Sequence, residues 1–115
     1  MSLIAFGVNH KTAPVDVRER IAFGPERVQL ALQDLIDDCG AREAAIVSTC
    51  NRTEIYAHSE CVTDALVEWL AAFHSLSPDS LRPYVYAHTD EEAIRHLMRV
   101  ACGLDSMVLG EPQIL

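Results

Sequence analysis

Residues 46–56, IVSTCNRTEIY, contain the pattern around which the predicted sheet is built. The apolar run 44–47 predicts a buried strand, and residues 53–58, which are rich in β-branched and aromatic side chains, predict a second strand. Asn51 tolerates the left-handed backbone conformation that tight turns need, so residues 49–52 are expected to connect the two strands. The sequence therefore predicts a β-hairpin with Cys50 in its turn, at the end of a sheet.

Cys50 is placed where a thiol is held rigidly and is still reached from outside. The thiolate is the reactive form, and a free cysteine with a pKa of about 8.5 is mostly protonated at neutral pH unless a cation or dipole lowers that pKa. Arg52, two residues further on, is a permanent cation on the same turn. Two interpretations stay open from this stretch alone: a reactive thiol, or a small apolar packing residue.

Composition limits the class of protein. The 115 residues fit one domain, and 50% of them are hydrophobic, which is enough for a sizeable core. No segment has the length of apolar sequence that a membrane span needs, and no positive flank precedes the first apolar stretch, so we expect a cytoplasmic domain without a secretory signal. The net charge of −8 argues against a general nucleic-acid-binding surface.

The cysteines and histidines show no metal-binding spacing. Cys39, Cys50, Cys61 and Cys102 are widely separated and include no CxxC pair, which argues against a zinc site and, in a cytoplasmic protein, against a disulfide framework. No metal is expected. Cys39 is interpreted as a packing residue, and any further role of Cys39, Cys61 and Cys102 stays open.

Two packing helices flank the predicted hairpin. The first has a proline, Pro25, at its first position and ends at Gly40. Its apolar residues recur at helical spacing and are expected to be buried: Val28, Ala31, Leu32, Leu35 and Ile36. The second covers residues 62–74 and is expected to bury Leu66, Trp69, Leu70 and Phe73. Shorter elements are predicted at 3–8 (strand), 15–23 (helix, with Arg18 and Arg20 exposed), 78 onward (a helical turn capped by Ser77) and 84–88 (strand).

A third long helix is expected to begin at the capping-box pattern of residues 89–92, with Thr89 and Glu92 as the capping side chains, and to stop at Gly103. Its apolar stripe is predicted to face the core: Ile94, Leu97, Met98 and Ala101. His96 then points away from that stripe. It is either solvated, as Arg95 and Arg99 are, or it faces a site on the other side of the helix.

The order of elements predicts an α+β domain whose mostly antiparallel sheet is of the split βαβ (ferredoxin-like) kind, packed by helices, with the third long helix near the C-terminus. We expect one domain over residues 1–115, with the α+β sandwich at 1–90 and the helix and the start of a connection at 90–115. A reactive cysteine and an off-stripe histidine make thiol-based acyl transfer the sharpest chemical hypothesis.

Three longer motifs occur in order: GVNHKTAPV at 7–15, STCNRTE at 48–54 and GLDSMVLGEPQIL at 103–115. They closely resemble the three signatures of the catalytic N-terminal domain of the glutamyl-tRNA reductase family, and the resemblance covers the whole chain. It implies NADPH-dependent reduction of glutamyl-tRNA to glutamate-1-semialdehyde, the first step of the five-carbon route to 5-aminolevulinate and haem. Because the sequence stops inside a family pattern, the NADPH-binding and dimerisation domains are expected to lie outside it, and this part alone is not expected to act as a reductase.

The resemblance also implies roles for individual residues. Cys50 would be the nucleophile that forms a thioester with the glutamyl group, and His96 would transfer a proton or position the ester. Arg52 would bind a carboxylate of the glutamyl group. The other implied substrate-binding positions are Thr49, Asn51, Ser106, Glu111, Pro112 and Gln113. Implied partners are glutamyl-tRNA, glutamate-1-semialdehyde aminomutase as a channelling partner, and a second copy of the full-length protein.

Two alternatives from other classes stay open. One is a haem-binding regulatory module in which cysteine or histidine ligates the iron, and a Soret band on titration with hemin would support it. The other is a thiol redox domain, which would show no preference for a glutamyl ester over other acyl groups.

Overall fold

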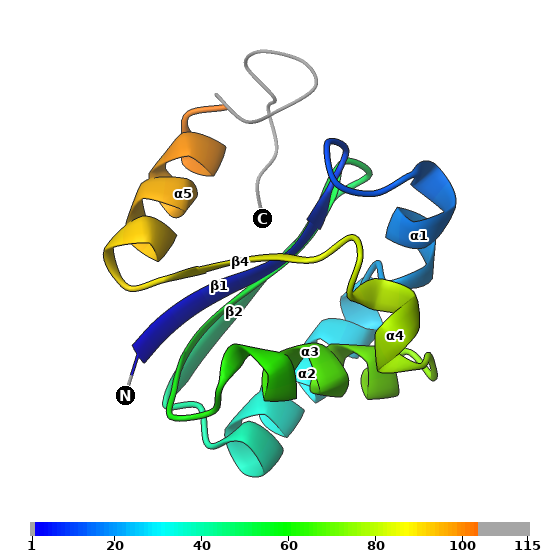
Figure 1. The fold of residues 1–115 in the computed structure, drawn as a ribbon. Coiled ribbons are helices and arrows are strands. Elements are labelled where there is room, and N and C mark those ends of the chain that lie inside the picture. Colours follow the sequence, from blue (N-terminus) through cyan, green and yellow to red (C-terminus); the bar gives the residue numbers. More distant parts are fainter. Residues whose placement is uncertain (1, 104–115) are drawn as a thin grey trace.

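The computed structural model describes residues 2–103, which form one sheet with helices on both of its faces (Figure 1). The strands are β1 (Ser2–Asn9), β2 (Glu43–Ser48), β3 (Arg52–Ser59) and β4 (Tyr86–Thr89). The helices are α1 (Val15–Arg20), α2 (Pro25–Cys39), α3 (Thr63–Phe73), α4 (Pro78–Leu81) and α5 (Glu91–Ala101). The expected α+β class is confirmed.

The sheet has the strand order β2-β3-β1-β4, and every neighbouring pair is antiparallel. β2 and β3 form the predicted hairpin, in which the backbone N–H of Thr49 donates to the carbonyl of Arg52 at 2.8 Å. β1 lies between β3 and β4, and Gly7 is paired with Glu54 on one side and Tyr86 on the other. The register thus brings the second and first sequence motifs together in the two central strands.

The main hydrophobic core lies between one face of the sheet and helices α1 to α4. Alternate residues of the central strands point into it, because successive side chains of a strand point to opposite faces: Ile4, Phe6, Val8, Ile55 and Ala57. The predicted helix faces supply Ala31, Leu35, Leu66, Trp69 and Leu70. Ile36, predicted to be buried, is 44% exposed, because it lies about 80° around the helix from Val28 at 100° per residue.

Ser77 stands at the N-cap of α4 as predicted, although its side chain makes no capping hydrogen bond. Two local predictions are wrong. The N-cap of α5 is Asp90 rather than Thr89, again without a side-chain cap, because the Asp90 carboxylate instead accepts the backbone N–H of Leu3 at 3.1 Å and joins the helix to β1. Arg18 is half-buried rather than exposed, since its Nη1 donates to the carbonyl of Ala13 at 2.8 Å.

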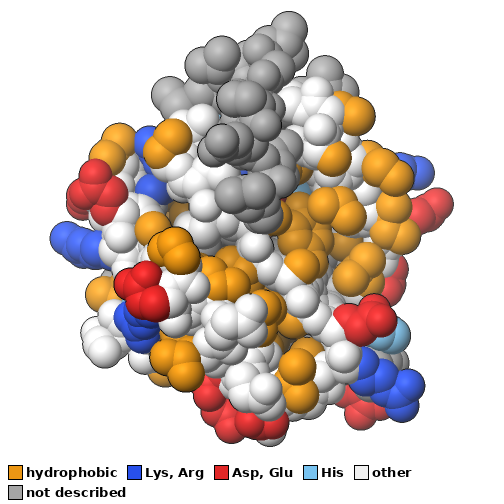
Figure 2. Space-filling model, turned by 180° about the vertical axis from the view of Figure 1, so that it is seen from behind, with side chains coloured by type: hydrophobic (Ala, Val, Ile, Leu, Met, Phe, Trp, Pro, Cys, Tyr) orange, Lys and Arg blue, Asp and Glu red, His pale blue; other side chains and the backbone are white. Residues whose placement is uncertain are grey.

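Helix α5 faces the sheet with a different side from the predicted one. Its buried residues are Ala93, His96 and Val100. The stripe expected in the core is exposed instead, with Ile94 at 49%, Leu97 at 39% and Met98 at 61%. Figure 2 shows hydrophobic side chains at the surface on the side where α5 lies. The sheet face beneath α5 carries a small apolar cluster, in which Ala93 packs with Ala5, Val47 and Tyr56, beside the polar side chains of Arg52, Glu54 and Tyr86. Apolar periodicity therefore did not identify the buried side of this helix.

Within residues 2–103, the helices are all too short or too polar to cross a membrane.

Gly7 offers a test of the sheet register. A Cβ atom at this position would lie 2.0 Å from the Thr53 carbonyl oxygen, a backbone atom that cannot move independently of β3. We expect Gly7→Ala to lower the free energy of unfolding by about 1–3 kcal/mol, the usual cost of overpacking, measured by urea denaturation. The matched control is Gly24→Ala, whose Cβ would meet only the flexible Glu26 carboxylate at 3.1 Å. Equal urea midpoints for the two variants would contradict this register.

Candidate active site

Cys50 is exposed on the turn between β2 and β3. The base of this turn is fixed by side chains: the Ser48 and Thr53 hydroxyls are hydrogen-bonded at 3.2 Å, and Ser48 Oγ accepts the backbone N–H of Phe23 at 3.0 Å. Within the turn, the backbone N–H of Asn51 donates to Thr49 Oγ1 at 3.2 Å. The thiol is therefore reached by solvent while its backbone is held from both strands and from the segment before α2.

The turn forms one wall of a pocket of about 250 Å³. Thr49, Cys50 and Asn51 line it from the turn, and the α1 region lines it from the other side with Val15, Arg18, Glu19 and Ala22. Arg18 is held in place by its hydrogen bond to the Ala13 carbonyl. Arg18 is therefore the cation that lines the pocket of the Cys50 thiol. The sequence did not indicate this, because Arg18 and Cys50 are 32 residues apart and no sequence pattern connects them.

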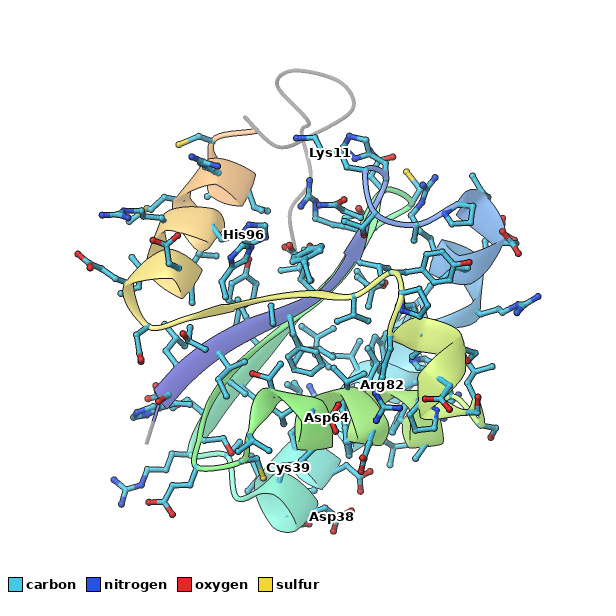
Figure 3. The ribbon with its side chains drawn as sticks, in the orientation of Figure 1. Lys11, Asp38, Cys39, Asp64, Arg82 and His96 are labelled. Carbon is cyan, nitrogen blue, oxygen red and sulfur yellow. The ribbon has the colours of Figure 1, made fainter. Side chains whose placement is uncertain are left out.

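The loop after β1 lies at the same end of the sheet. Asn9 pairs with Arg52 in the sheet, and Asn9 Oδ1 accepts the backbone N–H groups of Lys11 at 2.9 Å and Thr12 at 3.2 Å. This local turn is the one that asparagine side chains favour. It places the exposed Lys11 at the sheet end that also carries the β2–β3 turn (Figure 3).

Below the turn, Glu54 is the centre of a buried polar cluster on the face covered by α5. Glu54 Oε2 accepts hydrogen bonds from Arg52 Nη1 at 3.4 Å and from the Tyr86 hydroxyl, and it is bonded to His96 Nε2. Oε1 accepts from the Tyr56 hydroxyl at 3.1 Å. Both Arg52 and Glu54 are 0% exposed. Figure 3 shows His96 pointing from α5 toward the sheet.

The cluster keeps Glu54 ionised. Burial alone would raise the pKa of this carboxyl group, but the hydrogen bonds from His96 and Tyr86 and the charges of His96 and Arg52 outweigh burial, so the pKa lies below its usual value of 4.5. Burial and the Glu54 charge raise the pKa of Tyr86, so this hydroxyl stays a neutral donor. Because an ionised carboxylate only accepts hydrogen bonds, His96 donates from Nε2. In the neutral form of the ring Nδ1 is then the accepting nitrogen, and in the charged form both nitrogens are donors.

His96 also borders a small pocket at the surface. His88 stacks on His96 with ring centroids 4.6 Å apart, and the two line a cavity of about 130 Å³ with Glu92, Arg95 and Arg99. Arg95 pairs with Glu92 at 2.9 Å. Among the described residues there is no group of three or more metal-ligating side chains.

The structure thus divides the predicted site residues between two places. Thr49, Cys50 and Asn51 lie together at the pocket, whereas Arg52 and His96 meet at Glu54, beneath the turn. The predicted positions Ser106, Glu111, Pro112 and Gln113 lie outside the described residues.

Glu54, Tyr56 and Tyr86 were not singled out from the sequence. The sequence of β3 did indicate Glu54 and Tyr56. Arg52, Glu54 and Tyr56 are spaced by two residues, so in a strand their side chains lie on the same face. No such pattern indicated Tyr86, which comes from another strand.

The importance of the Glu54 charge is tested by comparing the stability of a variant without the charge with that of a variant that lacks one hydrogen-bond donor to it. Glu54→Gln keeps the shape but removes the buried negative charge of the ion pair with Arg52, and we expect it to cost about 3 kcal/mol of unfolding free energy near neutral pH. Tyr86→Phe removes a single neutral donor and is expected to cost about 1 kcal/mol. Chemical denaturation of both variants measures the difference. If Glu54→Gln were no more costly than Tyr86→Phe, Glu54 would not be the charged centre.

Known proteins resemble this chain over its length. The family described as "Glutamyl-tRNAGlu reductase, N-terminal domain" matches residues 6–115. The glutamyl-tRNA reductases of Pseudoalteromonas atlantica and Ectopseudomonas mendocina are 60% and 58% identical to it across 100% of this chain and 27% of their own length.

A solved structure agrees. The glutamyl-tRNA reductase from Methanopyrus kandleri superposes with a TM-score of 0.71 at 31% identity, covering 95% of this chain and 24% of that chain. This chain therefore spans about a quarter of the length of its relatives. The family match over residues 6–115, with the identity to its members, shows that the chain belongs to the glutamyl-tRNA reductase family and corresponds to its N-terminal domain.

Proposed function

We propose that this chain performs the acyl-transfer half of glutamyl-tRNA reduction, with Cys50 as the nucleophile. The observation that carries the proposal is the exposed thiol on a fixed turn, at a pocket that Arg18 lines, in a chain 60% identical to a glutamyl-tRNA reductase. A reactive cysteine needs access and a cation nearby. Cys50 is exposed, and Arg18 lines its pocket together with Glu19. The complete reaction is reduction of glutamyl-tRNA to glutamate-1-semialdehyde, the first step of tetrapyrrole synthesis.

In the proposed step, the Cys50 thiolate attacks the carbonyl carbon of the ester that joins glutamate to the tRNA ribose. A carbon–sulfur bond forms, the carbon–oxygen bond breaks, and the ribose oxygen leaves with a proton. The product is a thioester, which accepts hydride more readily than an ester, so covalent catalysis replaces one difficult step by two easier ones.

Cations and hydrogen-bonding groups around the pocket suit the glutamyl group. Arg18 lines the pocket. Arg52 is buried beneath the turn and paired with Glu54, and we keep the proposal that it binds a carboxylate of the glutamyl group. A guanidinium group binds a carboxylate through two parallel hydrogen bonds. Thr49 and Asn51 contribute polar groups at the pocket wall. We propose the same substrate-binding role for Ser106, Glu111, Pro112 and Gln113, which lie outside the described residues.

His96 is proposed to transfer a proton or to position the ester. Its Nε2 is bonded to Glu54, four residues after Cys50, rather than to the turn itself. The carboxylate orients the ring through Nε2, so a proton transferred to or from the substrate would pass through Nδ1.

NADPH is proposed to bind outside this chain. A dinucleotide site of the usual kind is built on parallel strands with a glycine-rich turn before a helix. The strand pairs among residues 2–103 are all antiparallel, and the sequence contains no GxGxxG pattern, so the described residues do not fit this cofactor. The hydride step therefore does not belong to this part of the protein.

The partners are proposed on the same basis. Glutamyl-tRNA is the substrate, and the acidic net charge of −8 leaves its contacts to local cations such as Lys11, Arg18, Arg20 and Arg99. We propose a cytoplasmic enzyme that transfers its product to glutamate-1-semialdehyde aminomutase and forms a homodimer through regions outside this chain. We keep haem as a proposed regulator. A Soret band on titration with hemin would support haem binding.

We also infer that the fold is of the split βαβ (ferredoxin-like) kind. β1 and β2 run in the same direction because both are antiparallel to β3, which lies between them. β3 and β4 flank β1 in the same way. This arrangement supports a sandwich over residues 1–90, with α5 and the start of a connection at 90–115.

The thioester is tested by intact-mass analysis after incubation with glutamyl-tRNA in the absence of NADPH. We expect a hydroxylamine-sensitive glutamyl adduct on the wild-type chain and none on Cys50→Ser, because serine at this position lacks the thiolate. The matched control is Cys102→Ser, which removes the other exposed thiol and should keep the adduct. An adduct that survives Cys50→Ser, or no adduct despite tRNA binding, would contradict the proposal.

A further inference from the structure

Two other thiols meet at the opposite end of β3 from Cys50. Cys39 is the last residue of α2, and Cys61 follows β3 directly before α3. The Cys61 thiol donates a hydrogen bond to the Cys39 carbonyl oxygen at 3.0 Å. Figure 3 shows Cys39 at the end of α2, near the segment that leads from β3 to α3. The contact joins two segments that the sequence places on either side of the catalytic turn.

Ser59 holds the two cysteines together. Its hydroxyl donates to the Cys39 carbonyl at 2.7 Å and accepts the backbone N–H of Cys61 at 3.0 Å. One side chain thus binds both cysteine backbones and keeps them adjacent, as a disulfide requires. If the Cys61 sulfur left the Cys39 carbonyl, that buried oxygen would still be satisfied by Ser59. Bond formation between the two sulfurs would therefore leave no polar group unpaired.

The two thiols differ in access. Cys39 is 8% exposed, and burial together with the neighbouring Cys61 thiol raises its pKa to about 11. Cys61 is partly exposed and lines an open pocket of about 370 Å³ with Ser59, Glu60 and Thr63. A small oxidant therefore reaches Cys61 first, while Cys39 stays sheltered behind it.

We propose that Cys39 and Cys61 are a redox-active pair that forms a reversible disulfide when a peroxide oxidises Cys61. In the first step the Cys61 sulfur takes a hydroxyl group from hydrogen peroxide, whose oxygen–oxygen bond breaks to release one water. The Cys39 sulfur then attacks the Cys61 sulfur, the sulfur–oxygen bond breaks, and a second water leaves. The two thiols lose two electrons and two protons, which reduce one peroxide to two waters, and a dithiol reverses the reaction by exchange.

The pair is separate from the proposed acyl transfer, because it lies at the other end of β3 and uses neither Cys50 nor His96. It is tested in the protein carrying Cys50→Ser and Cys102→Ser, so that only the pair remains. After treatment with hydrogen peroxide, trypsin cleaves at Arg42 and Arg52 and places the two cysteines on different peptides. We expect a non-reducing map to show these peptides joined, with the mass of two hydrogen atoms lost, and separated again by dithiothreitol.

Two further variants make the result decisive. With Cys39→Ala, Cys61 has no partner, and dimedone should now trap its sulfenic acid. With Ser59→Ala, which removes the hydroxyl that holds both backbones, the disulfide should form severalfold more slowly. Stable oxidation of Cys61 to sulfenic or sulfinic acid while Cys39 is present, or two peptides that remain unlinked, would overturn the proposal.

Discussion

The second face of the sheet depends on the buried carboxylate of Glu54. A carboxylate removed from water is strongly unfavourable unless donors replace its hydration. Here β3 supplies Arg52 and Tyr56, β4 supplies Tyr86, and α5 supplies His96. These donors come from three elements, so the charge of a single residue fixes how β4 and α5 sit on the central strands. The same contacts engage Nε2 of His96 and leave Nδ1 as the nitrogen that is not bonded to Glu54.

This requirement explains two features that hydrophobic packing does not. Helix α5 turns His96 toward the sheet and leaves the apolar side chains of Ile94, Leu97 and Met98 exposed. Leaving the buried Glu54 carboxylate without this donor would cost more free energy than leaving the apolar side chains exposed to water. Gly7 lies between Glu54 and Tyr86 in the sheet, and these two residues bond across it. The turn that carries Cys50 thus lies between the main apolar core on one face of the sheet and, on the other face, the buried Glu54 cluster beside a smaller apolar cluster.

The sequence predicted what depends on local chemistry and periodicity. The hairpin around Cys50, the helix that ends at Gly40 in the left-handed conformation, and the buried face with Leu66 and Leu70 all follow from rules that act within a few residues. The orientation of α5 does not, because it is decided by Glu54, which lies 42 residues before His96. Arg18 at the Cys50 pocket could not be predicted from the sequence either, because it meets Cys50 only through the tertiary structure. Where a polar cluster is buried, apolar periodicity indicates the wrong face of a helix.

The most direct test of this account is the titration of the Glu54 side-chain carboxyl, followed by its ¹³C chemical shift in the folded protein. We expect the midpoint of this carboxyl to lie below the usual value of 4.5, since the surrounding donors favour the charged form more than burial opposes it. The stability that these bonds contribute is then present above about pH 4.5 and is lost as the pH falls through the folded-state midpoint. A midpoint at or above the usual value would contradict the account, because burial would then dominate and His96 would face a neutral acid rather than a charge.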